Sequence, residues 1–219
     1  MKRFPRMTLA AALPIILPVV LPIILIGCAS GGPASGVKGL APAQETWWEN
    51  LRGLCGKAYA GTLASTDPAD ASFAGQSMAM HVRKCEDARI EIPFHVGEDR
   101  SRTWVLSRTE TGIELKHDHR HEDGSEDEIT LYGGHTDSPS TGPSTGIAQL
   151  FPVDEYSKKL FVEHDRTPST TNVWSMEIVP GERFSYILRR PGRHFQVDFD
   201  LTRTIEPPPA PWGYEPASP

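Results

Sequence analysis

The sequence lacks the short motifs that identify many enzymes: it contains no GxGxxG fingerprint, no phosphate-binding P-loop and no HExxH pair. Cysteine is scarce, with three residues in 219 and no CxxC pair, so a cysteine-rich zinc site is excluded. Positive charge is not in excess, because 22 Lys and Arg face 28 Asp and Glu and leave a net charge of −6. That balance argues against nucleic acid as a partner, since nucleic-acid-binding proteins present a basic face.

Long apolar runs are missing except at the N-terminus, where residues 7–26 are almost entirely apolar. Cations within the first six residues precede this run, and residues 1–27 contain no acid, which is the pattern of an export signal. The alternative is an uncleaved transmembrane helix, since about twenty apolar residues just span a bilayer. Against it, prolines recur every fourth residue and would repeatedly break such a helix. They are Pro14, Pro18 and Pro22.

The end of this run, Leu25-Ile26-Gly27-Cys28, resembles the lipobox of bacterial lipoproteins. The resemblance implies that residues 1–27 are a lipoprotein signal peptide and that Cys28 becomes the first residue, lipidated on its sulfur and acylated on its amine. Several acyl chains, at about 0.8 kcal/mol per buried methylene, would anchor the protein without a spanning helix. In this class the following Ala29 implies sorting to the outer membrane. We therefore expect a lipid-anchored protein of the cell envelope that faces the periplasm.

Two further cysteines, Cys55 and Cys85, lie 30 positions apart in the mature chain. In an oxidising periplasm a disulfide is the default for such a pair. We therefore predict a Cys55–Cys85 bond, worth on the order of 3–4 kcal/mol in the chain-entropy model. Two free buried thiols are the alternative, and neither interpretation makes these cysteines catalytic.

Composition divides the mature chain into three parts. Residues 28–43 are mostly small and uncharged and predict a flexible tether, whereas residues 206–219 are Pro-rich and predict an extended or disordered tail. Residues 44–205 remain as one folded domain, which is long enough to bury a core without a partner. We expect a monomer that contacts the membrane through its lipid anchor.

The folded domain begins with a helical pattern and continues with strands. Thr46 is the predicted N-cap, and apolar residues at helical spacing follow it: Trp47, Trp48, Leu51 and Leu54. After the helix, turn sequences separate ten or eleven short predicted strands. They are 57–65, 78–82, 90–96, 103–108, 112–119, 128–132, 147–151, 160–164, 173–179, 184–190 and 195–201.

Short sequential connections favour a mainly β fold, an antiparallel up-and-down meander that closes into a barrel and so removes its exposed edges. One helix with about ten strands resembles the calycin architecture of lipocalins and fatty-acid-binding proteins. The resemblance is an analogy of strand count alone, because the lipocalin Gly-x-Trp motif is absent. A jelly roll and an open sandwich are the alternatives.

The most unusual stretch holds three histidines among charged residues. Alternate residues of a strand share a face, so His117 and His119 follow Ile113 and Leu115 on one side, with His121 beyond them. An apolar face that ends in histidines predicts the mouth of a cavity. Histidines at i and i+2 can also chelate a divalent metal ion or ligate haem. The alternative is an exposed hairpin tip.

Just upstream, a charged turn leads into the strand that contains Trp104. Its arginines, Arg100 and Arg102, predict binding of a carboxylate or phosphate, and ion pairs with the neighbouring acids are the alternative. Residues 97–134 together resemble a segment of certain uncharacterised exported bacterial proteins. That resemblance implies no known activity.

The sequence leads to three functional hypotheses. The first is a small or apolar ligand held inside the barrel against Trp104, with His117, His119 and Arg102 as polar anchors. The second is a metal-dependent enzyme in which His117, His119 and His121 hold an ion that activates water. The third is a structural envelope lipoprotein whose tether and tail contact other partners. No catalytic residue is identified, so the enzyme hypothesis ranks behind ligand binding.

Overall fold

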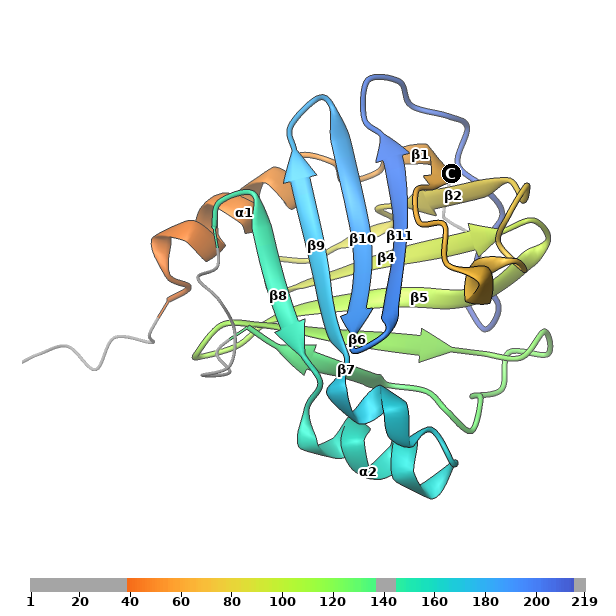
Figure 1. Ribbon diagram of the computed structural model, residues 1–219. Helices are drawn as coiled ribbons and strands as arrows, with labels where there is room; N and C mark the ends of the chain where they lie inside the picture. Colours follow the sequence, from red (N-terminus) through yellow and green to blue (C-terminus); the bar gives the residue numbers. More distant parts are fainter. Residues whose placement is uncertain (1–38, 137–144, 215–219) are drawn as a thin grey trace, which may run out of the picture. The chain divides into compact units, whose positions relative to one another are not determined.

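Hydrogen bonds join eleven strands into one antiparallel sheet in the computed structural model, which describes residues 39–136 and 145–214 (Figure 1). Ten of these strands follow one another around a nearly closed barrel, in the order β7-β6-β5-β4-β2-β1-β11-β10-β9-β8. The strands are β1 (Ala58–Leu63), β2 (Met78–His81), β3 (Lys84–Cys85), β4 (Arg89–Val96), β5 (Asp99–Arg108), β6 (Ile113–His119), β7 (Tyr132–His135), β8 (Ala148–Pro152), β9 (Val173–Val179), β10 (Arg183–Arg190) and β11 (Arg193–Asp200). The predicted mainly β, up-and-down barrel is confirmed.

The barrel closes along a seam between β7 and β8, where Gly134 and Val153 form an isolated bridge. Two glycines allow the backbones to approach closely here. A Cβ atom at Gly133 would lie 1.7 Å from the Leu115 carbonyl oxygen, and one at Gly134 would lie 2.0 Å from the Pro152 carbonyl oxygen. Both distances are far shorter than atomic contact, so Gly134 allows β7 to approach β8 at the seam and Gly133 allows β7 to approach Leu115 of β6 on its other side.

Alternate strand residues and one helix fill the barrel with aromatic side chains. Along β4, Ile90, Ile92 and Phe94 alternate and join the buried core, as the sequence period predicts. The largest fully buried side chains include Trp47, Trp48, Trp104, Trp174, Phe151, Phe184 and Phe199. Each aromatic side chain buries about 150–250 Å², so these residues dominate the apolar area removed from water.

Helix α1 (Pro42–Arg52) covers the end of the barrel where β5 finishes. Its Trp47 indole donates to the Met176 carbonyl oxygen at 3.2 Å, and its Glu45 carboxylate pairs with Arg108 at 2.6 Å. The predicted helix is confirmed, but it begins four residues before Thr46, so the end of the predicted tether is helical. The Thr46 hydroxyl donates to the Pro42 carbonyl oxygen inside the helix instead of capping it.

Two predicted strands are wrong. Residues 160–164 belong to helix α2 (Glu155–Glu163), where the Asp154 carboxylate caps the first turn by accepting from the Ser157 amide at 2.7 Å. The five residues 160–164 begin with three consecutive apolar residues, and a run this short does not distinguish a strand from a helix. Of the predicted strand 128–132, only Tyr132 lies in β7, because Leu131 adopts a left-handed φ of 55° that interrupts the extended chain.

The predicted disulfide between Cys55 and Cys85 is present, with a Cα–Cα distance of 6.2 Å. Cys55 follows helix α1, and Cys85 lies in β3, a two-residue strand that pairs with β4. The bond therefore ties the helix-bearing N-terminal part of the domain to the sheet.

The C-terminal segment 206–214 lies on the outside of the barrel. It is extended, which is one of the two conformations predicted for the tail. The Trp212 amide donates to the Arg100 carbonyl oxygen at 3.1 Å, and the Arg100 guanidinium donates to the Ala210 carbonyl oxygen at 3.2 Å. The Tyr214 hydroxyl donates to the Asp118 carboxylate at 2.6 Å. This segment covers the outer face of β5 and β6.

Several predicted features lie outside the described residues. They are the signal peptide 1–27, Cys28 with its lipobox, the tether up to residue 38, and residues 215–219. Within the described part, neither α1 nor α2 has the length and hydropathy of a membrane-crossing helix.

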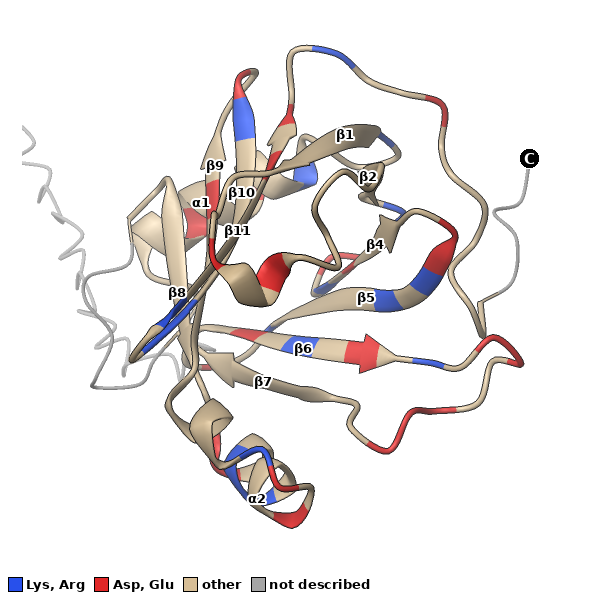
Figure 2. Cartoon of the chain, turned by 45° about the vertical axis from the view of Figure 1, so that its right-hand side comes forward, with Lys and Arg blue, Asp and Glu red and all other residues tan. Residues whose placement is uncertain are grey.

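Figure 2 shows acidic residues following one another in the loop between β6 and β7, and acidic and basic residues side by side at the start of β5.

Candidate functional site

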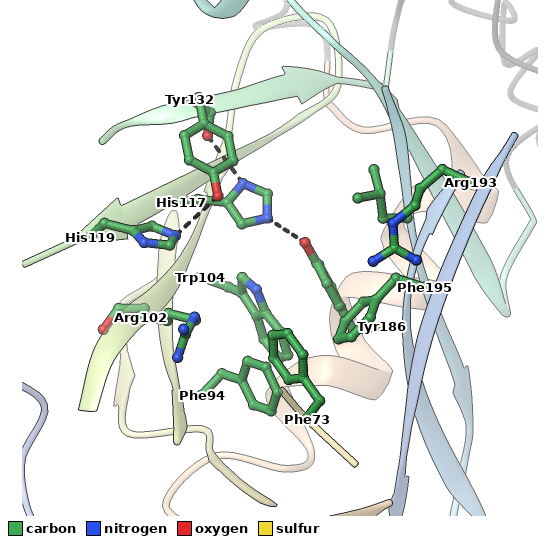
Figure 3. A pocket seen from close by; sticks show the side chains of 12 residues that line it. Phe73, Phe94, Arg102, Trp104, His117, His119, Tyr132, Tyr186, Arg193 and Phe195 are labelled. Carbon is green, nitrogen blue, oxygen red and sulfur yellow. Dashed lines mark hydrogen bonds between the residues drawn. The ribbon is translucent and has the colours of Figure 1, made fainter. Parts of the chain in front are cut away.

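A cavity of about 160 Å³ lies inside the barrel at the end opposite α1, where β5 begins and β6 finishes (Figure 3). Most of its wall is aromatic. The lining residues are Phe73, Phe94, Arg102, Thr103, Trp104, His117, His119, Tyr132, Tyr186, Leu188, Arg193 and Phe195. Cavities of about 150 Å³ accept one benzene ring, so this space suits a single small ring or a short chain.

All four predicted ligand contacts line this cavity, while their binding role stays a prediction. Strand register explains why they meet: Arg102 pairs with His119 and Trp104 pairs with His117 across β5 and β6. Residues two apart in a strand share a face, so both pairs point into the barrel. The predicted cavity near the histidines is therefore present.

Two hydrogen bonds fix the His117 ring. Its Nδ1 lies 3.1 Å from the Tyr132 carbonyl oxygen, which can only accept, so Nδ1 carries the proton and donates. Its Nε2 therefore accepts the Tyr186 hydroxyl proton over 2.8 Å. Burial lowers the pKa of His117 to about 3. The ring is consequently neutral in neutral solution, with one tautomer selected by its surroundings.

His119 and the two tyrosines are also held in their neutral forms. The His119 Nε2 lies 3.0 Å from the Tyr132 hydroxyl, and burial with the nearby Arg102 charge lowers the pKa of His119 to about 4. Burial raises the pKa of Tyr132 to about 12 and that of Tyr186 well above its ordinary value. The cavity therefore offers uncharged hydrogen-bonding groups on an aromatic wall.

Stacked rings form one side of the cavity. The Trp104 ring lies 5.0 Å from the Phe94 ring and 4.4 Å from the Tyr186 ring, with interplanar angles of 16° and 21°. The three nearly parallel rings pack against one another, so this side of the cavity is apolar and aromatic.

Two arginines with carboxylate partners border the cavity. Arg102 lies 2.7 Å from Asp99, and Arg193 pairs with Asp67 at 3.1 Å and with the buried Asp70. Asp70 closes the short 3₁₀ helix η1 (Pro68–Asp70), so its ion pair holds the segment that carries Phe73 over the cavity. The local ion pair proposed from the sequence is thus present at Arg102.

The structure separates several residues that the sequence placed together. Arg100, expected beside Arg102, faces the C-terminal segment on the outside of the barrel. His121 is exposed in the turn after β6 and does not line the cavity. Among the described residues, no three His, Cys, Asp or Glu side chains are grouped as a metal site requires, so the predicted set of His117, His119 and His121 is not assembled.

A second, more polar pocket of about 360 Å³ adjoins the first. Four residues belong to both walls: His119, Tyr132, Tyr186 and Leu188. The second pocket adds residues from the loop between β6 and β7, from the α2 region, from β9 and from the end of β10: Asp127, Ile129, Phe161, Arg166, Ser169, Asn172, Trp174 and Arg190. The two spaces together form a site with an apolar part and a polar part.

The sequence interpretation missed Tyr132, Tyr186 and Arg190. A signal for two of them exists in β10, where Phe184, Tyr186, Leu188 and Arg190 alternate and the last residue turns polar. The inward face of β6 shows a similar change, from apolar residues to histidines. No comparable signal marks Tyr132, because the strand that contains it is four residues long and holds two glycines.

No protein family, curated protein or solved structure matches this chain in the comparisons made, so the site geometry alone directs the functional interpretation.

Proposed function

We propose that this chain is an outer-membrane lipoprotein of the periplasmic face whose β-barrel binds a small or apolar ligand. The anchor is supported by the basic N-terminus, the apolar run and the lipobox at residues 25–28. Ligand binding is supported by the cavity at the barrel end opposite α1.

The observation that carries the binding proposal is the composition of the cavity wall. Stacked aromatic rings supply an apolar surface, His119 supplies a neutral hydrogen-bonding group, and His117 fixes the Tyr186 hydroxyl at the cavity wall. Ligand sites combine mostly apolar walls with a few positioned polar groups, which is the arrangement here. The cavity is smaller than sites for drug-sized molecules, so the ligand part inside it is about one ring in size.

Calorimetry on the full-length protein in lipid nanodiscs tests ligand binding, with empty nanodiscs as reference and 3-phenylpropionamide as the probe. We expect saturable binding to the wild type and at least tenfold weaker binding to Leu188→Phe, because Leu188 lines the cavity and a larger ring occupies its space. Leu160→Phe is the matched control, since Leu160 is half-buried on α2 and does not line the cavity. Equal binding to both variants would overturn the proposal.

Labelling of cells with a radioactive fatty acid tests the anchor. The wild-type protein should incorporate label and sediment with membranes, whereas Cys28→Ser should lose both properties. Cys55→Ser is the control because Cys55 is disulfide-bonded. Label retained on Cys28→Ser would disprove this anchor.

A further inference from the structure

The charge of the ligand can be inferred from the second pocket, and this step rests on the proposed binding function. The two spaces meet at His119, Tyr132, Tyr186 and Leu188, so a ligand with its ring in the apolar cavity can extend a substituent into the polar pocket. The charged groups of the polar pocket determine which substituent binds there.

Arg190 differs from the other arginines of the site in its partners. Its guanidinium donates to the Asn172 side-chain oxygen at 3.0 Å and to the Ser169 hydroxyl at 3.4 Å, and both acceptors are neutral. Arg102 and Arg193, in contrast, each face a carboxylate. Across residues 39–136 and 145–214, no carboxylate forms an ion pair with Arg190, and the acid that acts on its charge, Asp67, is itself paired with Arg193.

The position of Arg190 makes this charge costly in the empty site. The residue is half-buried, and burial with the neighbouring Arg193 lowers the pKa of Arg190. Only one of its two terminal nitrogens takes part in the hydrogen bonds to Asn172 and Ser169, so donors remain for a planar anion. A carboxylate accepts two parallel N–H bonds from a guanidinium, which is a strong and directional contact.

Arg166 supports the same charge preference and Asp127 opposes it. Arg166 lines the polar pocket from an exposed position and forms no ion pair with a carboxylate of the described residues, so the pocket holds a second, solvated arginine. Asp127 also lines the pocket, and its carboxylate accepts the Ile129 amide at 2.8 Å. Two cations against one anion leave a positive balance.

We propose that the ligand is a small aromatic carboxylate whose ring occupies the apolar cavity and whose carboxylate binds Arg190 in the adjoining pocket. The aromatic wall and the cavity volume of about 160 Å³ set the ring size, and Arg190 sets the charge. His119 contributes a hydrogen bond without attracting charge, because its ring is neutral, and His117 uses both of its ring nitrogens to hold Tyr132 and Tyr186 at the cavity wall.

Three probes of equal length separate this inference from the binding proposal: 3-phenylpropionate, 3-phenylpropionamide and 3-phenylpropylamine. Their dissociation constants are measured by calorimetry at pH 7 on full-length protein in uncharged nanodiscs. We expect the carboxylate to bind at least tenfold more tightly than the amide, and the amine no more tightly than the amide. In Arg190→Gln the carboxylate advantage should fall below twofold while amide binding persists, which shows that the site still folds.

Two further variants complete the design. Arg190→Lys should keep part of the carboxylate advantage, because it keeps the charge and loses the planar fork. Arg189→Gln should keep all of it, since Arg189 is exposed and lines neither pocket. Equal binding of carboxylate and amide, or tightest binding of the amine, would refute the anionic ligand and leave the binding proposal intact. Failure of all three probes to bind would instead refute the binding proposal.

Discussion

The histidine inside the barrel predicts a specific dependence of stability on pH. Burial lowers the pKa of His117 to about 3 from the ordinary value of 6.5. Between these two pH values the unfolded chain binds a proton at this residue and the native chain does not. The stabilising effect is therefore complete above pH 6.5 and is lost progressively as the pH falls toward 3.

The magnitude follows from the two pKa values. At pH 5 His117 is almost fully protonated in the unfolded chain and remains neutral in the native barrel, so this residue alone costs about 2 kcal/mol of unfolding free energy relative to pH 7. His117→Gln removes the titration and can keep both hydrogen bonds. Its amide N–H can donate to the Tyr132 carbonyl oxygen, and its carbonyl oxygen can accept from the Tyr186 hydroxyl.

Urea unfolding at pH 7 and pH 5 measures the effect. The wild type should lose about 2 kcal/mol more than His117→Gln between the two pH values, whatever the stability of the variant at pH 7. His121→Gln, at an exposed position, should lose as much as the wild type. The other buried histidines are present in all three proteins, so their contributions cancel. Equal losses in the wild type and His117→Gln would refute a neutral His117 in the native barrel.

Three further predictions concern the framework of the barrel. Gly134→Ala should lower the unfolding free energy by about 1–3 kcal/mol or prevent folding, because the added Cβ would lie 2.0 Å from the Pro152 carbonyl oxygen. Gly39→Ala is the control and should have little effect, since no atom lies within 4 Å of the added Cβ. Reduction of the Cys55–Cys85 bond should shift the urea midpoint down by the equivalent of about 3–4 kcal/mol, and a midpoint equal in the oxidised and reduced proteins would contradict it. Tyr214→Phe should speed amide hydrogen exchange in residues 206–214, because it removes a hydrogen bond to a buried carboxylate. Unchanged exchange there would show that this bond does not hold the segment.

Much of the site could be predicted from strand periodicity. A period of two places Ile113, Leu115, His117 and His119 on one face, and the structure has three of these four buried and His119 at the cavity. The same rule applied to β10 identifies Arg190, but a single arginine at a strand end has no distinguishing chemistry until its partners are known. The neutral hydrogen-bond partners of Arg190 can therefore be recognised only in the folded structure.

Other parts of the site could not be predicted from the local sequence. Phe73 reaches the cavity from an irregular segment that is held by the pairing of Asp70 with Arg193, residues 123 positions apart. The metal hypothesis failed for a related reason. His121 follows the strand period on paper, but β6 ends at His119 and the chain turns, so the third histidine leaves the shared face.

The pairing of β1 with β11 has a consequence for how the barrel folds. The other contacts between neighbouring strands in the barrel join segments that are close in sequence, whereas Gly61 pairs with Phe199. Sheets with local pairing form faster than sheets that must close long loops. The meander can therefore assemble progressively from its hairpins, but β1 keeps an unpaired edge until the C-terminal strand arrives. A chain interrupted before residue 193 would retain that edge, which makes truncated products prone to aggregation.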